Sequence, residues 1–253
     1  MKELFSLAGK RALVTGSSRG IGRAIALGFA EFGADVAVHY AVRQQEAQDV
    51  AAEAARFGVR AATVGGDLAQ PGAARRVFNE SMSALGRIDI LVLNASVQLP
   101  EDFAKITAEQ FERQVAVNLK SSLELLQLAL PPMVERRWGR VLTVGSVQEF
   151  KPHPQMLVYA ATKSAQASMA RNLAKQVASC GITVNNLAPG VIDTERNRGR
   201  LADEAYRAKV LSLIPAGCIG EPADCVGTAL LLCSAAGGYI TGANFVVDGG
   251  MSL

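Results

Sequence analysis

The stretch LVTGSSRGIGRAIALGFA, residues 13–30, decides the fold of this chain. An apolar run leads directly into Gly16, Gly20 and Gly22, and an amphipathic run follows them. Glycine is needed where a backbone turns tightly, approaches a pyrophosphate, or lets a helix pack closely on a strand. The N-terminus of the following helix presents unpaired N–H groups and a positive dipole end to such a phosphate. The stretch therefore predicts a strand, a nucleotide-binding turn and a helix.

The same order of an apolar, β-branched run and a helical pattern repeats along the chain. Several of the apolar runs are nearly continuous, as expected of strands that are covered on both faces. Strands are predicted at residues 11–16, 34–40, 59–67, 88–95, 140–146, 182–190 and 243–250. Helices are predicted near residues 20–32, 43–57, 71–85, 107–130, 156–179 and 221–234. This alternation predicts one α/β domain over residues 1–253, a doubly wound (Rossmann) and mostly parallel sheet of about seven strands with helices on both faces.

Composition and charge exclude several other classes of protein. The 253 residues are 49% hydrophobic and 19% charged, which is typical of a globular protein. A formal charge of +3 without a run of Lys or Arg argues against a nucleic-acid partner. The four cysteines have no CxxC spacing and only two histidines accompany them, so no metal site is expected. No stretch has the length and apolar character of a membrane span or a signal peptide, so we expect a cytoplasmic protein.

The pattern YAATK places the phenol of Tyr159 and the ammonium of Lys163 four residues apart. On a helix these two positions lie on one face, one turn apart. A nearby ammonium lowers the pKa of a tyrosine from about 10 towards the range that is useful for acid–base catalysis. The pattern alone also fits a surface tyrosine packed beside a lysine stem, so the rest of the chain must decide between the two readings.

Further motifs follow one another over nearly the whole chain. They are TGSSRGIG (15–22), Asp67 after the third strand, NAS (94–96), Asn118, Ser146, YAATK (159–163) and PG (189–190). With this set the chain resembles the classical short-chain dehydrogenase/reductase family, and in particular its 3-oxoacyl-[acyl-carrier-protein] reductase-like members. The resemblance implies hydride transfer between a nicotinamide and a carbonyl or secondary alcohol. One departure is Ser96, which stands where the family usually has glycine and adds bulk beside the nicotinamide.

The resemblance also implies the roles of individual residues. Tyr159 transfers the proton, Ser146 orients the substrate oxygen, Lys163 also holds the nicotinamide ribose, and Asn118 holds a water of the proton relay. The cofactor-binding residues that it implies are Gly16, Ser18, Arg19, Gly20, Ile21, Gly22, Tyr40, Arg43, Asp67, Leu68, Asn94, Ala95, Tyr159, Lys163, Pro189, Gly190, Ile192 and Thr194.

The end of the second strand indicates which nicotinamide is used. NAD-preferring relatives have an acidic residue there, whereas this chain has Tyr40. Arg19 and Arg43 supply positive charge for a 2′-phosphate, and His39 is a candidate for a further hydrogen bond to it. These residues favour NADP(H), and NAD(H) stays an alternative.

Two substrate classes stay open. The first is a 3-oxoacyl thioester. Reductases that meet an acidic carrier protein need basic surface patches. Pro131, Pro132 and Cys180 stand where basic residues would help, which weighs against a carrier protein, although Arg136 and Arg137 could compensate.

The second class is a sugar, polyol or keto-acid. The arginines of TERNRGR (194–200) could bind a carboxylate or phosphate of such a substrate. Gln148, Glu149 and Gln155 would suit the recognition of hydroxyl groups. An alternative of another kind is a non-catalytic nucleotide-binding regulator, because a fold does not dictate a function. The presence of the tyrosine, lysine, serine and asparagine argues against it.

Two further expectations concern the lid and the assembly. Residues 191–220 interrupt the alternation of strands and helices, and a long excursion of this kind predicts a substrate lid. Members of the family are usually tetramers that pair through long helices and C-terminal strands. The segments SSLELLQLAL (121–130) and ANFVVDGGMSL (243–253) suit such contacts, so we expect a homotetramer.

Overall fold

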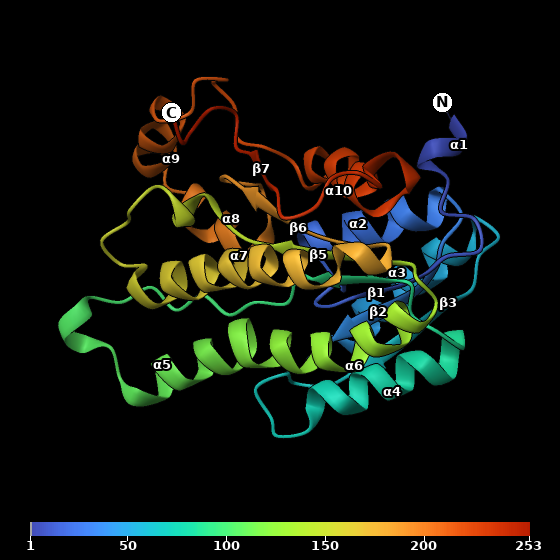
Figure 1. The fold of residues 1–253 in the computed structure, drawn as a ribbon. Coiled ribbons are helices and arrows are strands. Elements are labelled where there is room, and N and C mark those ends of the chain that lie inside the picture. The colour runs from blue at the N-terminus through green and yellow to red at the C-terminus, as the bar shows by residue number, and fades with distance from the viewer. Residues whose placement is uncertain (1) are drawn as a thin grey trace.

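Seven strands form one sheet at the centre of the protein, and the computed structural model describes residues 2–253 (Figure 1). The strand order is β3-β2-β1-β4-β5-β6-β7, and neighbouring strands are parallel throughout. The direction of winding reverses between β1 and β4, which is where doubly wound proteins bind their ligands. The strands are β1 (Arg11–Val14), β2 (Asp35–Tyr40), β3 (Ala61–Gly65), β4 (Ile90–Leu93), β5 (Gly139–Val144), β6 (Ile182–Pro189) and β7 (Asn244–Val247). The predicted fold class and each predicted strand are confirmed.

Helices connect the strands and cover both faces of the sheet. They are α1 (Lys2–Phe5), α2 (Gly20–Glu31), α3 (Gln44–Ala55), α4 (Ala73–Leu85), α5 (Ala108–Val115), α6 (Ser121–Glu135), α7 (Leu157–Val177), α8 (Glu195–Leu201), α9 (Glu204–Ser212) and α10 (Val226–Cys233). Short 3₁₀ turns occupy Phe103–Lys105, Val147–Glu149, Ala178–Cys180, Pro222–Cys225 and Ala235–Gly237. None of the helices in residues 2–253 combines the length and the apolar character that crossing a membrane requires.

The side chains of β1 show how the two layers are held. Successive residues of a strand point to opposite faces of a sheet. Val14 therefore joins a core with α2, α3 and α10, while its neighbour Leu13 joins a second core with α4, α6 and α7. Figure 1 shows α10 above the strands and α4 and α6 below them. Apolar residues on both faces explain why the strand sequences lack a polar side.

The helix predicted at residues 107–130 differs from the prediction in two ways. A π-helical turn, Ala116–Lys120, separates α5 from α6, and α6 continues through Pro131 and Pro132 to Glu135. An interior proline removes a helical hydrogen bond. Leu130 and Met133 are nevertheless buried on either side of the proline pair. Continuous packing of this apolar face outweighs the lost bond, so the predicted end at residue 130 was wrong.

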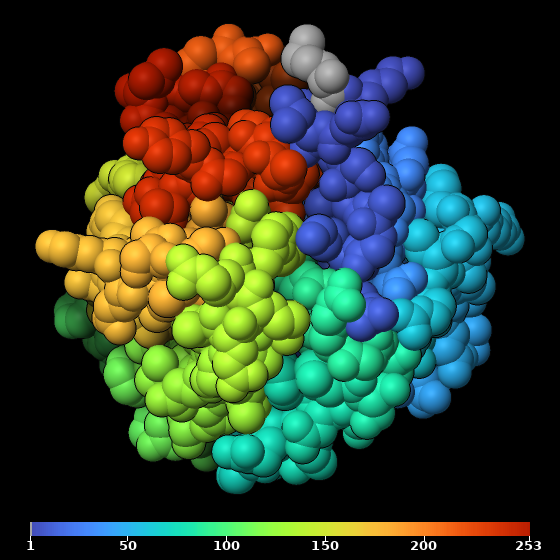
Figure 2. Space-filling view, turned by 45° about the vertical axis from the view of Figure 1, so that its right-hand side comes forward, coloured from blue at the N-terminus to red at the C-terminus, as the bar shows by residue number. Residues whose placement is uncertain are grey.

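The long segment after β6 contains α8 and α9, which the sequence did not predict. Its two ends meet at a bridge between Ile192 and Gly220, so the helices extend from a narrow neck. Val210 and Ile214 of this segment form a small separate core with Val147 and with Met251 near the C-terminus. Figure 1 places α8 and α9 beside the C-terminal end, and Figure 2 shows the N-terminal residues against the last third of the chain.

Candidate active site

A cleft of about 690 Å³ opens at the carboxyl ends of the central strands. The turn after β1, the ends of β4, β5 and β6, the first turns of α7 and the segment with α8 and α9 form its walls. The predicted site residues that line it are Gly16, Ser18, Arg19, Gly20, Ile21, Tyr40, Arg43, Asp67, Leu68, Asn94, Ala95, Ser146, Tyr159, Lys163, Pro189, Gly190, Ile192 and Thr194. The two remaining predicted residues, Gly22 and Asn118, do not line the cleft.

The glycine turn is fastened to the end of β4. Asn94 Nδ2 donates to the carbonyl oxygens of Thr15 at 2.8 Å and Gly16 at 2.9 Å. The backbone N–H groups of Asn94 and Ala95 in turn donate to Thr15 Oγ1. A Cβ at Gly22 would lie 2.4 Å from Asn94 Nδ2, so only glycine leaves room for this amide. The turn is therefore held in one shape with the N-terminus of α2 facing the cleft.

His39 has a structural position and does not reach out to a phosphate, which corrects the expected role. Its Nδ1 accepts the N–H of Gly16 at 2.8 Å, and its Nε2 lies 2.9 Å from the carbonyl oxygen of Gly66. Both ring nitrogens are therefore used, and the neutral ring joins the glycine turn to the end of β3. Burial lowers the pKa of His39 to about 4, because desolvation disfavours the charged ring more than the hydrogen bond to Gly66 and the charge of Asp67 favour it.

The two arginines expected to hold a 2′-phosphate already share an acidic partner. Glu195, the first residue of α8, forms ion pairs with Arg19 and with Arg43, the second at 3.3 Å. Arg43 also pairs with Glu46 at 2.5 Å. Both guanidinium groups line the cleft beside Tyr40, at the end of β2. The structure thus brings the predicted positive charges together and adds an acid that the sequence analysis did not single out.

Ser146, Tyr159 and Lys163 meet at the other end of the cleft. Ser146 lies beyond β5, and Tyr159 and Lys163 lie on the first two turns of α7. Ser146 Oγ accepts the N–H of Gln148 at 3.2 Å, and Ser146 and Tyr159 both line the cleft. Lys163 Nζ donates to the carbonyl oxygen of Val144 at 2.7 Å and to Gln166 Oε1 at 3.0 Å. It lies 5.8 Å from the centre of the Tyr159 ring.

The pKa values of Tyr159 and Lys163 differ from the expectation that the lysine charge lowers the pKa of the tyrosine. Burial raises the pKa of Tyr159, and the charge of Arg196 and the hydrogen bond from Ser146 oppose that rise. Burial, and after it the charge of Arg196, lower the pKa of Lys163 to about 7, while the charge of Glu149 opposes this shift. We expected Lys163 to lower the pKa of Tyr159. The phenol is instead stabilised in its protonated form, because desolvation of the phenolate outweighs the nearby positive charge.

Glu149 does not line the cleft, where it was expected to contact a substrate hydroxyl. It instead accepts hydrogen bonds that hold the loop containing Ser146 in place. Its Oε1 accepts the N–H of Ser146 at 2.9 Å, and its Oε2 accepts an N–H of the Asn244 amide at 2.8 Å. Asn186 Nδ2 donates to both carboxylate oxygens. The carboxylate therefore joins the loop after β5 to β6 and β7. Gln155, a second expected contact for hydroxyl groups, is exposed and does not line the cleft.

Two predicted residues have their side chains engaged elsewhere. Asn118, in the π-helical turn, donates to Val97 and to Thr162 Oγ1 and accepts the N–H of Val97. It joins the loop after β4 to α7, and its role in a water relay stays a prediction. Asp67 accepts the N–H of Ala69 and pairs with Arg113 at 3.2 Å. Its contact with the adenine amino group likewise stays a prediction.

Ser96, the departure from the usual glycine, has a specific partner. Arg196 of α8 donates to the Ser96 carbonyl oxygen at 2.8 Å and to its Oγ at 3.1 Å. The added hydroxyl therefore fixes an arginine from a distant part of the chain. Arg196 also lines the cleft, and its charge opposes the rise in the pKa of Tyr159.

A cleft at the reversal point of a doubly wound sheet, with a phenol at its closed end, defines a dinucleotide-dependent oxidoreductase. A family model described as enoyl-(acyl carrier protein) reductase matches residues 16–252. The chain belongs to the short-chain dehydrogenase/reductase family, and the resemblance inferred from its motifs is confirmed.

Proteins similar over their full length act on different substrates. An L-rhamnose 1-dehydrogenase (NADP⁺) of Thermoplasma acidophilum is 37% identical over 251 residues, with 97% of each chain covered. The crystal structure of a 3-oxoacyl-(acyl-carrier-protein) reductase of Agrobacterium tumefaciens with NADP bound has 40% identity and a TM-score of 0.94, with 99% of this chain and 97% of that chain covered. A gluconate 5-dehydrogenase of Burkholderia cenocepacia, in complex with NADP and tartrate, has 33% identity and a TM-score of 0.93, with 99% and 98% covered.

The buried histidine generates a prediction about acid stability. The pKa of His39 is lowered from 6.5 to about 4, so between these values the unfolded chain binds the extra proton and the folded protein does not. The free energy of unfolding is then lost as the pH falls from 6.5 towards 4, by up to about 1.4 kcal/mol per pH unit. Urea unfolding at several pH values should show this slope in the wild type and lack it in His39→Asn. His153→Asn is the matched control, and an unchanged slope in His39→Asn would contradict the assignment.

Proposed function

We propose that the protein is an NADP(H)-dependent oxidoreductase that interconverts a carbonyl group and a secondary alcohol through Tyr159. The observation that carries the proposal is that Ser146, Tyr159 and Lys163 line the same cleft, with Lys163 Nζ 5.8 Å from the centre of the Tyr159 ring. A non-catalytic regulator would not need a buried, reactive phenol beside an open cavity. The two structural relatives with bound NADP and the NADP⁺-dependent rhamnose dehydrogenase support the same reaction class.

A nicotinamide held in this cleft would supply or accept the hydride at the substrate carbon. In reduction, Ser146 and Tyr159 donate hydrogen bonds to the carbonyl oxygen, and the Tyr159 proton moves to that oxygen as the alcohol forms. The raised pKa of Tyr159 keeps this proton on the phenol until the oxygen becomes more basic. Lys163 is near enough to stabilise the phenolate that remains, and it would hold the ribose hydroxyls. Asn118 would take part in returning a proton to Tyr159.

The residues at the end of β2 fit NADP(H) better than NAD(H). Tyr40 presents no carboxylate that would repel a 2′-phosphate, and Arg19 and Arg43 face the same part of the cleft. The other residues that would hold the cofactor are Gly16, Ser18, Gly20, Ile21, Gly22, Asp67, Leu68, Asn94, Ala95, Pro189, Gly190, Ile192 and Thr194. Residues 191–220 would act as the lid, since they extend from the neck at Ile192 and Gly220 over the cleft.

The substrate choice is between a 3-oxoacyl thioester and a sugar, polyol or keto-acid. The similarity to a 3-oxoacyl-(acyl-carrier-protein) reductase supports the first class. The similarity to rhamnose and gluconate dehydrogenases supports the second. Gln148 is a polar residue that lines the cleft two positions after Ser146, which favours a substrate with hydroxyl groups.

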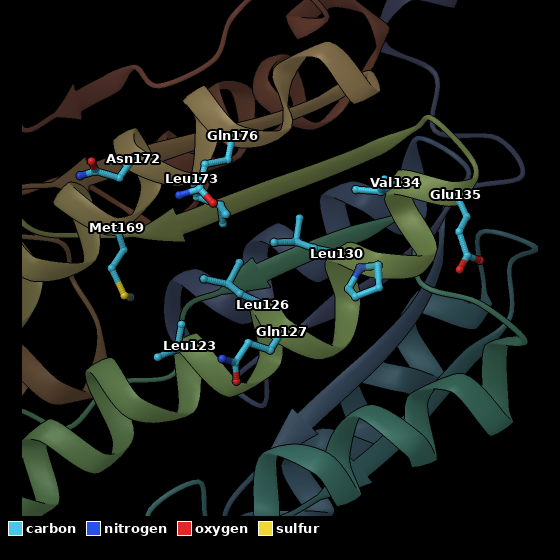
Figure 3. Close-up of a pocket in the computed structure, with 11 residues that line it drawn as sticks. Leu123, Leu126, Gln127, Leu130, Val134, Glu135, Met169, Asn172, Leu173 and Gln176 are labelled. Atoms are coloured by element: carbon cyan, nitrogen blue, oxygen red, sulfur yellow. The ribbon is translucent and has the colours of Figure 1, made fainter.

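A homotetramer is the assembly that the surface supports. Leu123, Leu126 and Leu130 of α6 and Met169 and Leu173 of α7 border an apolar groove of about 780 Å³ (Figure 3). The two helices lie on the outer face of the molecule, where a second copy could cover the groove. At the edge of the sheet β7 has a free side, and Val246 is exposed there. A second contact along β7 would extend a dimer to a tetramer.

Loss of the phenol should remove the reaction and leave cofactor binding intact. NADPH consumption is measured by absorbance with an acetoacetyl thioester, keto-sugars and keto-acids. Tyr159→Phe should lower kcat/KM by roughly 10²- to 10⁴-fold on the accepted substrate, because the proton donor is absent. NADPH binding, measured by fluorescence, should change little. A variant with wild-type turnover would refute the proposed role of Tyr159.

The shared acid at the end of β2 generates a prediction about cofactor preference. Arg43→Ala should weaken NADPH binding by roughly tenfold or more, since a charge-assisted contact to the 2′-phosphate is lost. Glu195→Gln should strengthen NADPH binding by roughly threefold to fivefold, because the amide competes less for the two arginines. Titration with NADH, which lacks the phosphate, should respond little to either change. If the two variants changed the affinity for NADH as much as the affinity for NADPH, these residues would not bind the 2′-phosphate.

The groove between α6 and α7 can be tested through the mass of the particle in solution. Sedimentation equilibrium should give four chains for the wild type. Leu123→Glu, at a position that is 47% exposed, should give smaller particles because a buried charge opposes the contact. Phe57→Glu, at a position that is 48% exposed and far from the groove, is the control. A wild-type monomer would contradict the assembly.

A further inference from the structure

The carboxylates that line the cleft lie at one of its ends, whereas Glu149, near Ser146, does not line the cleft and accepts hydrogen bonds from Ser146, Asn186 and Asn244. Among the described residues that line it, Asp67 and Glu195 are the only carboxylates. Asp67 pairs with Arg113, and Glu195 pairs with Arg19 and Arg43. Both acids therefore lie at the end formed by β2, β3 and the glycine turn, and basic partners neutralise them there.

The Tyr159 end has the opposite character. Arg196, Arg200 and Lys209 line it, and none of them forms an ion pair within the described part of the chain. His153 lies on the same wall, and its pKa is lowered by burial and by the charges of Arg200 and Lys209. Unpaired cations that converge on one cavity raise the local concentration of an anionic ligand.

Arg196 is the cation that lies closest to the reaction. Ser96 holds one end of its guanidinium through two hydrogen bonds from the same nitrogen, Nη2. The other nitrogens keep donors for a ligand, because a guanidinium carries five N–H groups in a rigid plane. Arg196 and Tyr159 line the same cleft, so an anion bound to the guanidinium would share that cleft with the reacting carbonyl group.

Gln148 adds an unfilled acceptor to the same cavity. Its Oε1 is buried and has no hydrogen-bond partner among residues 2–253. A buried carbonyl oxygen is normally satisfied, and a substrate hydroxyl would supply the missing donor. An acyl chain has no hydrogen to donate at this position.

From this arrangement we infer that the substrate is a small hydroxy carboxylic acid or the corresponding keto acid. Its carboxylate binds to Arg196 with support from Arg200 and Lys209, and a hydroxyl group donates to Gln148. The inference rests on the proposed oxidoreductase function and narrows its substrate class. Neutral sugars and polyols fit less well, because they would leave the three cations without a partner.

The experiment compares substrates that differ only in charge. NADP⁺ reduction is followed with a panel of five- and six-carbon aldonic acids and with the amide of each acid. The amides keep the hydroxyl groups and lose the negative charge. Acetoacetyl-CoA with NADPH is a further arm, because its phosphates are another source of negative charge. We expect kcat/KM for the accepted acid to exceed that for its amide by roughly tenfold or more.

Variants of neighbouring arginines test which side chain reads the charge. Arg196→Gln should lower kcat/KM for the acid by roughly tenfold more than for its amide, so that the preference for the acid is lost even though the charge of Arg196 also acts on Tyr159. Arg198→Gln is the matched control, since Arg198 pairs with Asp193 at 3.1 Å and does not line the cleft. Arg196→Lys should restore part of the affinity for the acid. Gln148→Leu should raise KM for acid and amide alike.

The outcomes separate this inference from the proposed function. Preference for the acid that disappears in Arg196→Gln supports both. Turnover of neutral carbonyls or of the thioester alone, lost in Tyr159→Phe, overturns the inference and leaves the oxidoreductase standing. Equal losses on acid and amide in Arg196→Gln also overturn it, because the residue would then act on structure and not on charge. No turnover on any compound despite NADPH binding overturns both.

Discussion

The Asn94 amide holds the ends of β1 and β4 together, and the cleft is built outward from that contact. Its two hydrogen bonds to Thr15 and Gly16 fix the glycine turn, and the space that Gly22 leaves free makes them possible. The chain continues from Asn94 to Ser96, which holds Arg196 in the wall of the cleft that Tyr159 also lines. One short segment after β4 therefore sets the phosphate-facing turn at one end of the cleft and a cation at the other.

Much of the fold could be predicted because its signals are local. The seven strands are short apolar runs between turns, and burial on both faces gives them that composition. The π-helical turn around Asn118 and the continuation of α6 past Pro131 depend on packing against other elements, which no local pattern contains. The candidate site followed from motif order. The motif order did not predict the contacts of His39 and Glu149, because each side chain has a hydrogen-bond partner that is distant in sequence.

Glu149 shows how a polar residue can support a site without touching a substrate. A buried carboxylate is costly unless hydrogen bonds replace its water. Here Ser146, Asn186 and Asn244 supply the donors, and they come from the loop after β5, the middle of β6 and the start of β7. The loop that holds the Ser146 hydroxyl is therefore tied to β6 and β7, so its geometry is set before a substrate arrives. This arrangement reduces the reorganisation that catalysis would otherwise require.

The beginning of α8 links the two ends of the cleft. Glu195 and Arg196 are consecutive, yet the first pairs with Arg19 and Arg43 and the second contacts Ser96 beside Tyr159. Glu195 neutralises the arginine pair at one end of the cleft, and the backbone of the same helical turn carries the guanidinium that Ser96 orients. Because consecutive residues of one helix point in different directions, a single turn of α8 serves both ends of the cleft.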